Sequence, residues 1–385
     1  MIKINEKLMI AVVPFWMDLS ASIFYLAAPL VVIDLGGNPI ELGLIGTITA
    51  AVHMLLANLA GRLSDRFGRR MLMIVGPLIF GVSCLLMTQI PNVKGVLALA
   101  ALNGCGMAVF WPAFQAWVAE SRNGSGLARN IGSFNMSWTA SHLLGPTLAG
   151  FLFALHARLP FWMAALLCFS LFLAMWASAK ERAFHPGLEG ESRPSESAEP
   201  KFGRNFLYAI WIANFASFFI LGNARYQFPK LARELTMSSY TIGLLMSCIG
   251  FAQFLGFFLL RGSARWHFNR LYLFGAQLLA AVGLVLLVYT SNRGLVFAST
   301  FLMLGFCASL TYYSSLYYAV RLLQRKGKGA GLHESILGGG VVLGPLLGGV
   351  AAHTAGLRAP YVLCLNLLAV AVAAEWIILR AKSGR

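Results

Sequence analysis

The sequence predicts an all-α membrane protein of twelve transmembrane helices, arranged as two pseudo-symmetric six-helix bundles with both termini in the cytoplasm. Of its 385 residues, 58% are hydrophobic and only 11% are charged, and the mean hydropathy is +0.72. A soluble domain needs roughly 25% charged residues to cover its surface. The apolar sequence also divides into twelve runs, and positive charge gathers in alternate connections between them.

Each of the twelve runs is long enough to cross a bilayer, whose hydrocarbon core requires about 20 residues of helix. The runs are separated at Gly, Pro, Asn and clusters of charge. Because backbone amides inside hydrocarbon must bond internally, each run is expected to be a helix. In chain order the expected helices are 8–33, 41–61, 71–90, 95–119, 130–155, 159–179, 205–228, 238–260, 271–290, 294–320, 330–353 and 359–379.

The two ends of this series and its middle define the domains. The first run is too long for the h-region of a signal peptide, so we expect it to be retained as a span. The longest polar stretch, 180–204, is rich in Ser, Pro, Glu and Arg and is predicted to be a cytoplasmic linker. It follows six runs and precedes six more, which predicts an N-terminal bundle at 1–179 and a C-terminal bundle at 205–385.

The two halves repeat weakly. A shift of 199 residues aligns SHLLGPTLAG (141–150) with GVVLGPLLGG (340–349), so that Gly145 and Pro146 meet Gly344 and Pro345. A shift of 200 aligns Gly43 with Gly243. Parallel repeats of this kind suit a transporter whose site lies at the membrane midplane between the halves.

The distribution of charge predicts the orientation. With the N-terminus inside, 23 of the 30 Lys and Arg residues fall in cytoplasmic segments and seven in outer ones. This asymmetry places both termini in the cytoplasm. The net charge of +16 is therefore a topology signal, and a nucleic-acid partner is not expected.

Motifs for other protein classes are missing from the sequence. The six cysteines lie inside apolar runs without CxxC or His/Cys ligand spacing, so neither a disulfide nor a metal site is predicted. There is no Walker loop and no cofactor motif. No HExxH and no convincing Ser/His/Asp set occurs, so the chain is not expected to be an enzyme.

The decapeptide GRLSDRFGRR (61–70) places five charges between the second and third runs. It resembles the loop signature of the major facilitator superfamily, G-x-L-x-D-R-x-G-R-R/K, and the resemblance in layout covers essentially the whole chain. The resemblance implies the major facilitator fold and a gating latch, or, alternatively, a cation cluster that only enforces topology. The latch residues would be Gly61, Asp65, Arg66, Gly68, Arg69 and Arg70. The second-half loop, 261–270, lacks the acid, so a weaker latch or none is expected there.

The fifth run resembles the superfamily pattern G-x-x-x-G-P-x-x-G-G, which is associated with antiporters. A complete copy also occurs in the eleventh run, so duplicated helix packing explains both copies equally well. The packing residues would be Gly145, Pro146, Gly150, Gly344, Pro345 and Gly348. An Arg that members often carry in the fourth span is replaced by Ala100, which puts proton coupling by that route in doubt.

Ionisable residues inside a membrane span cost about 2.5–3.5 kcal/mol, so each needs a reason. Asp18, midway along the first run, is the strongest candidate for proton or cation coupling; the alternative is a structural hydrogen bond. His333 and Glu334 lie near the inner end of the eleventh run and either line the inner mouth or, for Glu334, pair with a nearby Lys. His53 and His142 are expected to be packing residues.

Polar and aromatic residues of several runs are candidates for the solute cavity. Arg225, late in the seventh run, either faces the cavity and binds an anionic group or anchors the helix at the interface. The remaining candidates are Trp111, Gln115, Asn135, Asn214, Gln253, Tyr313 and Tyr317. Acids near the ends of spans, Glu375 among them, are expected to reach headgroups or water.

These observations predict a secondary active transporter of a small amphipathic or aromatic organic solute. We expect ion-coupled efflux by alternating access, with H⁺ as the coupling ion. Uptake of a nutrient or organic anion by a proton- or cation-coupled symporter is the alternative, and a non-transporting sensor or scaffold on the same fold is a third. The expected setting is a bacterial inner or plasma membrane, with the chain as a multi-pass monomer.

Overall fold

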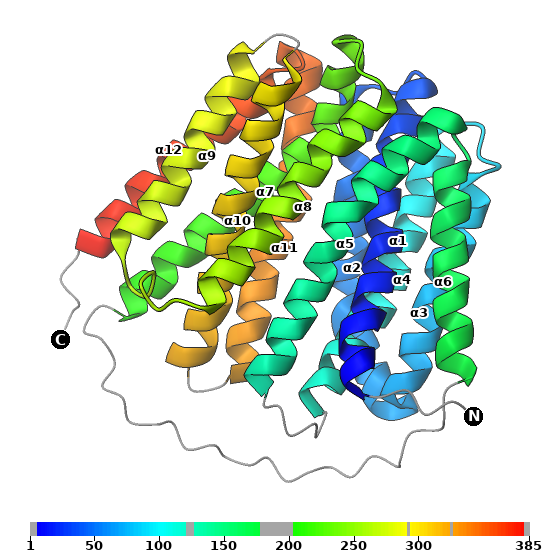
Figure 1. Ribbon diagram of the computed structural model, residues 1–385, viewed down its shortest axis with the longest axis horizontal. Coiled ribbons are helices and arrows are strands. Elements are labelled where there is room, and N and C mark those ends of the chain that lie inside the picture. The colour runs from blue at the N-terminus through cyan, green and yellow to red at the C-terminus, as the bar shows by residue number, and fades with distance from the viewer. Residues whose placement is uncertain (1–5, 121–126, 178–202, 291–292, 324–325, 381–385) are drawn as a thin grey trace.

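The computed structural model describes residues 6–120, 127–177, 203–290, 293–323 and 326–380. These residues form twelve long helices joined by short turns (Figure 1). Their bounds are α1 Glu6–Asp34, α2 Pro39–Phe67, α3 Arg69–Met87, α4 Val93–Glu120, α5 Leu127–Leu155, α6 Leu159–Ala177, α7 Gly203–Glu234, α8 Ser239–Arg261, α9 Arg270–Tyr289, α10 Gly294–Leu322, α11 Lys326–Ala355 and α12 Ala359–Arg380. Each predicted span is confirmed as a helix, although α2 and α7 continue beyond the predicted ends at 61 and 228.

Eleven of these helices are long and apolar enough, over their described residues, to cross a membrane. The remaining helix, α5, carries many polar residues in its first half. Asn135, Ser137, Thr139 and Ser141 on α5 are all buried. Because α5 packs against α1 on one side and α8 on the other, these polar groups face protein and not lipid. The chain is therefore a multi-pass membrane protein in which one helix is largely covered by its neighbours.

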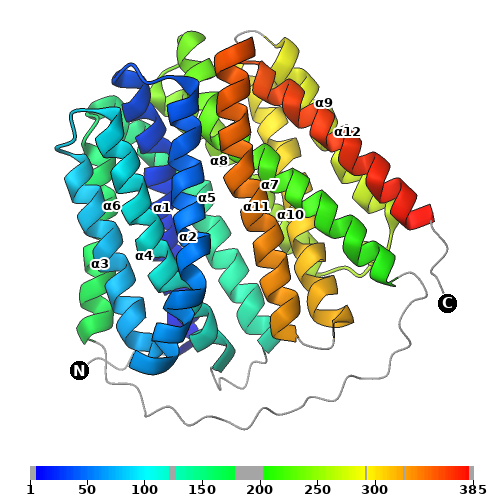
Figure 2. The same ribbon diagram turned by 180° about the vertical axis from the view of Figure 1, so that it is seen from behind.

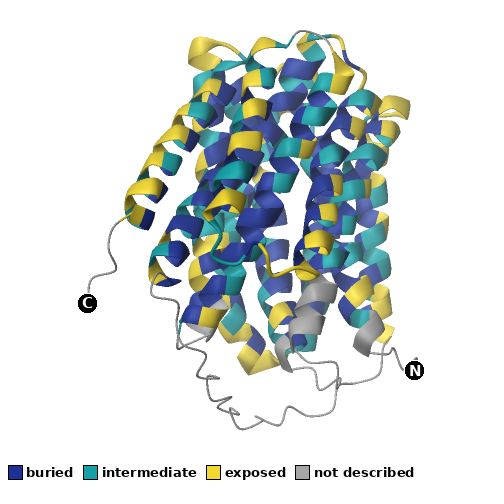
Figure 3. Cartoon of the chain, turned by 60° about the vertical axis from the view of Figure 1, so that its left-hand side comes forward, coloured by how far each residue is buried: buried dark blue, intermediate teal, exposed yellow. Residues whose placement is uncertain are grey.

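The helices form two groups of six that lie side by side. Helices α1–α6 make one group and α7–α12 the other, as the views from both sides show (Figures 1 and 2). The groups meet through α5 against α8 and α2 against α11, with α1 and α2 also touching α7. Buried residues lie along the inner faces and exposed ones over the outer surface (Figure 3). The predicted linker falls almost entirely outside the described residues, and α7 begins at Gly203.

The two ends of the bundle differ in charge. We call the end where α1 begins and α12 ends the basic end, since Arg69, Arg261 and Arg380 lie there. We call the opposite end, where α1 stops at Asp34 and α7 at Glu234, the far end. Both labels refer to the molecule alone and not to a side of the membrane.

Corresponding turns of the two halves have the same helix-capping arrangement and the same backbone conformation, which supports the weak repeat in the sequence. At the far end, Asn38 and Ser238 cap α2 and α8 through their side chains. Each follows a residue with positive φ two positions earlier, Gly36 at 77° and Thr236 at 61°. The four positions pair at a shift of 200, so the similarity extends to backbone conformation.

A buried acid in the second half corrects one expectation. Glu375 on α12 was expected to reach headgroups or water, but its side chain is fully buried. Its Oε1 accepts a hydrogen bond of 2.8 Å from Nε2 of Gln277 on α9. Since a buried polar group without a partner is costly, this bond explains how α12 accommodates an acid inside its bundle.

Candidate functional site

The two halves are joined by polar contacts at the far end. Lys230 Nζ donates to the Gly37 carbonyl at 3.1 Å, and Gln227 Nε2 donates to the Pro39 carbonyl at 3.1 Å. The Arg233 guanidinium lies 3.7 Å from the Asp34 carboxylate. All three bonds run from α7 to the α1–α2 turn, so they close the far end of the interface.

Further contacts continue this closure toward the middle of the bundle. Thr147 on α5 and Ser247 on α8 have their side-chain oxygens 2.7 Å apart. Thr47 on α2 donates to the Val342 carbonyl of α11 at 2.9 Å. The backbones of α5 and α8 also touch directly at Gly150, whose position leaves no room for a Cβ beside Ser239 and Gly243. Small residues permit this approach of two helices inside a membrane.

Toward the basic end, the described contacts between the two halves are aromatic and no longer polar. Trp138 on α5 packs against Phe257 and Tyr312 of the second half, with ring centroids 5.8 and 5.7 Å apart. Beyond this level the ribbons of the two groups diverge (Figures 1 and 2). On α2 the residues past the middle, such as Leu55 and Leu59, are exposed. The hydrogen bonds between the halves described above all lie between the far end and the middle, so these contacts close the interface at the far end.

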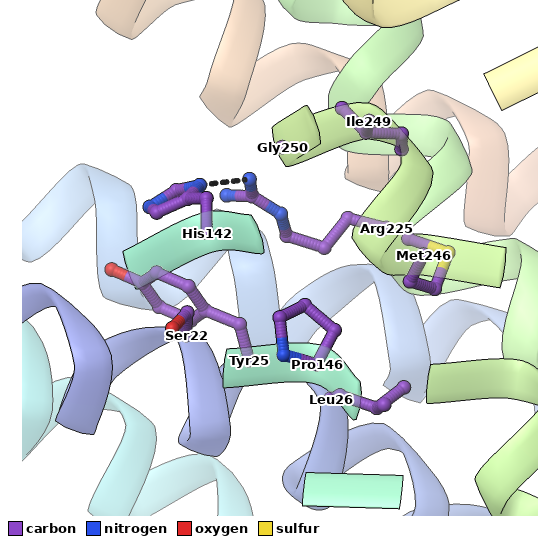
Figure 4. A pocket seen from close by; sticks show the side chains of 9 residues that line it. All are labelled: Ser22, Tyr25, Leu26, His142, Pro146, Arg225, Met246, Ile249 and Gly250. Carbon is purple, nitrogen blue, oxygen red and sulfur yellow. Dashed lines mark hydrogen bonds between the residues drawn. The ribbon is translucent and has the colours of Figure 1, made fainter. Parts of the chain in front are cut away.

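A small cavity lies between the halves at the middle of this interface (Figure 4). Its volume is about 20 Å³, which is roughly enough for one water molecule. Four helices contribute to it: α1, α5, α7 and α8. The lining residues are Ser22, Tyr25, Leu26, His142, Pro146, Arg225, Met246, Ile249 and Gly250.

Arg225 is the one cation among the residues that line this cavity. Its Nη2 lies 3.2 Å from Nδ1 of His142, so the contact joins α7 to α5 across the two halves (Figure 4). Because a guanidinium only donates, Nδ1 must accept, and His142 is neutral with its proton on Nε2. The guanidinium also lies over the Tyr25 ring, 5.3 Å from its centroid. Arg225 therefore lies at the interface between the halves, and α7 does not end near it but continues nine residues further to Glu234.

Asp18 is an acid within electrostatic range of this cation. It lies on α1, two turns from Tyr25 on the same helical face, and is buried at 7% exposure. Its carboxylate interacts electrostatically with Arg225 from the opposite half. Asp18 thus points into the interface and not at acyl chains. When Asp18 is ionised, it and Arg225 attract each other across the interface between the two halves. Neutralising either charge removes that attraction and so changes the energy of holding the halves together.

Several predicted cavity residues lie elsewhere. Trp111 packs among Phe110 and Phe114 on its own helix, and Gln115 is exposed. Asn135 accepts a hydrogen bond from Trp138 at 3.2 Å. Asn214 and Gln253 are buried. None of these five residues lines the small cavity.

The candidates on α10 and α11 form a separate group. His333 is bound to Ser315 at 2.7 Å and packs against Tyr312, while the neighbouring Glu334 is exposed. Tyr313 and Tyr317 line a different pocket at the basic end. The roles predicted for these residues remain predictions.

Sequence reasoning missed Tyr25 and His142 as members of the site. His142 was expected to be a packing residue, but it contacts the cavity cation. A signal was available for Tyr25, because the shift of 200 that aligns the halves pairs Tyr25 with Arg225. Equivalent positions in two repeats that face each other lie close to the symmetry axis between them. The pairing of Tyr25 with Arg225 therefore indicated that the two side chains lie near each other at the interface.

The described contacts of the predicted latch residues join them to the first half. Asp65 pairs with Arg69, and Arg69 also donates to Ser64 at 3.1 Å. Arg70 donates to the carbonyls of Met175 and Trp176 at the end of α6, 3.0 Å each. Arg66 lies over the Phe67 ring. These contacts all lie within the first half, and the role of the loop as a latch stays a prediction.

The two glycines predicted for this loop differ. Gly68 has φ of 92° and separates α2 from α3, which is a turn that favours glycine. Gly61 lies inside α2, and a Cβ added there would meet nothing within 4 Å.

The small-residue motifs of α5 and α11 are tightly packed in both halves. Gly145 abuts Ser22 of α1, whereas Gly344 abuts Phe219 of α7 and Gly348 abuts Asn223 of α7. Pro345 approaches Gly43 of α2. Pro146 lines the cavity. Close packing thus accounts for both copies of the pattern.

Comparison with known proteins identifies the family of the chain. The model of the Major Facilitator Superfamily matches residues 8–222 and 210–385. Multidrug resistance protein 1 of Bacillus subtilis is 24% identical over 322 residues, covering 78% of both chains. The quinolone resistance protein NorA of Staphylococcus aureus is 21% identical over 368 residues, covering 93% of this chain and 91% of NorA.

Solved structures share the fold. A bacterial homologue of the human lysosomal transporter Spinster, in an inward-facing and occupied conformation, superposes with a TM-score of 0.77 at 16% identity and covers 97% of this chain and 96% of its own. The nucleoside transporter NupG gives 0.75 at 12% identity, covering 98% and 100%.

Proposed function

The chain belongs to the major facilitator superfamily, and we propose that it is a proton-coupled transporter that exports a small amphipathic or aromatic organic solute by alternating access. The observation that carries this proposal is the charged contact at the middle of the interface. Arg225 from one half meets His142 from the other at 3.2 Å, with Asp18 within electrostatic reach. Buried charges inside a membrane protein mark substrate or ion pathways.

The proposed orientation follows from the charges. Since 23 of the 30 cations fall at the basic end or in its connections, that end faces the cytoplasm. The structure, closed at the far end, is then an inward-facing state. Solute enters from the cytoplasm beside Arg225, and closure of the basic end with opening of the far end releases it outside.

In the proposed coupling, a proton and the solute bind alternately, as antiport requires. The solute binds while Asp18 is ionised, with an anionic group on Arg225 and a cationic group facing Asp18. A proton taken up by Asp18 removes the second of these attractions, which weakens the binding and releases the solute. Export is favoured by the named activities of the relatives, a multidrug and a quinolone resistance protein. The cation itself also suits an organic anion taken up by symport, which is the alternative direction.

Arg225→Gln is expected to raise the KM for a fluorescent quinolone, whose carboxylate needs a cation, by about tenfold or more. A hydrogen bond to a charged group contributes about 1.5–3 kcal/mol, and every 1.4 kcal/mol is tenfold. The measurement is uptake into proteoliposomes with and without an imposed pH gradient of either sign. Lys94→Gln, which removes an exposed cation of the far end, is the matched control.

The same assay separates the candidate functions. Accumulation driven by a gradient that is acidic on the substrate-receiving side supports antiport, and accumulation with the opposite sign supports symport. If neither gradient moves the quinolone nor any of a panel of amphipathic dyes, the transporter proposal fails and a sensor or scaffold on this fold takes its place.

A further inference from the structure

A second pocket lies at the basic end of the second half, away from the Arg225 cavity. It has a volume of about 310 Å³ and is formed by the end of α8, the turn to α9 and one face of α10. Its lining residues are Leu260, Arg261, Gly262, Ser263, Ala264, Trp266, His267, Tyr313 and Tyr317. The pocket is open to the surroundings, since Arg261 to Ala264 are exposed.

The wall formed by the turn is held in place by its own hydrogen bonds. The buried Trp266 donates from Nε1 to the Leu260 carbonyl at 3.0 Å. The Phe268 amide donates to the Tyr318 hydroxyl at 2.6 Å, with Phe268 at a positive φ of 51°. A bulky residue seldom adopts this conformation unless its surroundings impose it. The pocket is thus preformed by contacts between the turn and α10.

The charge in and around the pocket is positive. Arg261 interacts electrostatically with Tyr313 on the opposite wall. Arg321 donates to the Tyr317 hydroxyl at 2.5 Å, and His267 stacks on the Tyr317 ring at 4.6 Å. Burial, and then the charge of Arg321, lower the pKa of His267. No Asp or Glu is among the nine lining residues, of which Arg261 carries a guanidinium group; the Arg321 guanidinium lies beside the pocket, over the Tyr317 ring.

The turn beside the pocket also differs in charge from its counterpart in the first half. At a shift of 200, Asp65 of the first half corresponds to Arg265, and Arg69 corresponds to Asn269. Asp65 and Arg69 pair with each other in the first half. The second half thus has a basic residue, Arg265, where the first half has an acidic one. At these two positions the turn of the second half is therefore more positive, because it lacks the acid that neutralises Arg69 in the first half.

We propose that this pocket binds a phosphate group, supplied by an anionic phospholipid headgroup or by a soluble phosphate. Guanidinium groups bind phosphate oxygens through paired, charge-assisted hydrogen bonds. The side chains of Ser263, Tyr313 and His267 place further polar groups in the same pocket. Basic pockets near the bilayer surface are established features of headgroup recognition. Because the site does not include Arg225 or Asp18, its existence does not depend on the transport proposal.

The test uses the full chain, purified and delipidated in detergent. The thermal unfolding midpoint is measured against inorganic phosphate, short-chain phosphatidylglycerol and, as a zwitterionic control, short-chain phosphatidylcholine, because a ligand of the folded state raises its stability. We expect phosphate, phosphatidylglycerol or both to stabilise the protein in a saturable way. Stabilisation by phosphatidylglycerol alone identifies the lipid source, and stabilisation by phosphate alone identifies the soluble one.

Two pocket variants test the assignment. The double variant Arg261→Gln, Arg321→Gln removes both guanidinium groups, and Ala264→Glu places a negative charge on the exposed wall. Each is expected to weaken the response by about tenfold or more, since each lost charge-assisted bond contributes more than a decade of affinity. Arg380→Gln, at the same end but on α12 over Trp376, should respond like the wild type. Equal stabilisation of wild type and both pocket variants, or no stabilisation of the wild type by either anionic probe, would overturn the proposal.

Discussion

Asp18→Asn is expected to abolish gradient-driven accumulation while leaving downhill exchange of the solute intact. Asn has nearly the same shape as Asp but cannot bind and release a proton, so the charge that faces Arg225 no longer changes. A potential of 100 mV supplies about 2.3 kcal/mol per proton, which corresponds to roughly a fifty-fold concentration ratio. In proteoliposomes the accumulation ratio should therefore fall from that order to one.

Glu234→Gln is the matched control for this experiment, because it neutralises an exposed acid at the end of α7. Its accumulation ratio should equal that of the wild type. If Asp18→Asn still concentrates the solute as strongly as the wild type under the same gradient, Asp18 is not the coupling residue. Retained exchange in the variant is equally important, since loss of all transport would point to misfolding.

Gly243→Leu is expected to prevent closure of the far end. A Cβ at Gly243 meets the backbone of α5 at Pro146 and Gly150, which cannot move aside as a flexible side chain could. Overpacking of this kind costs about 1–3 kcal/mol, and the cost applies only to the state in which α5 and α8 touch. The equilibrium between the two states should shift by about 5- to 150-fold toward the state open at the far end.

A reporter on the other side of the interface distinguishes global opening from a local change. In a cysteine-free background, Thr47→Cys places a thiol between α2 and α11, where Thr47 now donates to Val342. Its labelling by a membrane-impermeant maleimide should accelerate by about fivefold or more in Gly243→Leu. Gly275→Leu is the control, because nothing lies near that glycine. An unchanged labelling rate in Gly243→Leu would contradict the proposed role of the contact.

The helices were predictable because hydrocarbon imposes strong rules on sequence. Apolar runs, Gly and Pro breaks and Arg clusters located all twelve helices and both six-helix groups. The ends were less certain: α7 runs to Glu234 because its last turns, with Gln227 and Lys230, are stabilised by bonds to the α1–α2 turn. Such bonds depend on a partner about 190 residues away, which local sequence does not show.

The site was predictable in part. Asp18 and Arg225 could be singled out because charges are rare inside spans. Their position relative to each other depends on how two bundles dock, and the sequence carries only the faint trace that pairs Tyr25 with Arg225. Tyr313 and Tyr317 share a helical face, but that spacing does not show which way the face turns, and it turns to a different pocket. The partner of Glu375 was hidden for a similar reason, since Gln277 lies on another helix.

The central claim is that the two halves separate at the far end during each transport cycle. Thr147 and Ser247 test it directly, because their side-chain oxygens lie 2.7 Å apart across α5 and α8. Thr147→Cys and Ser247→Cys would be combined in a chain whose six free cysteines have been replaced. Oxidation should cross-link α5 to α8 and stop transport, and reduction should restore it. Transport by the oxidised, cross-linked protein at the rate of the reduced protein would contradict the account.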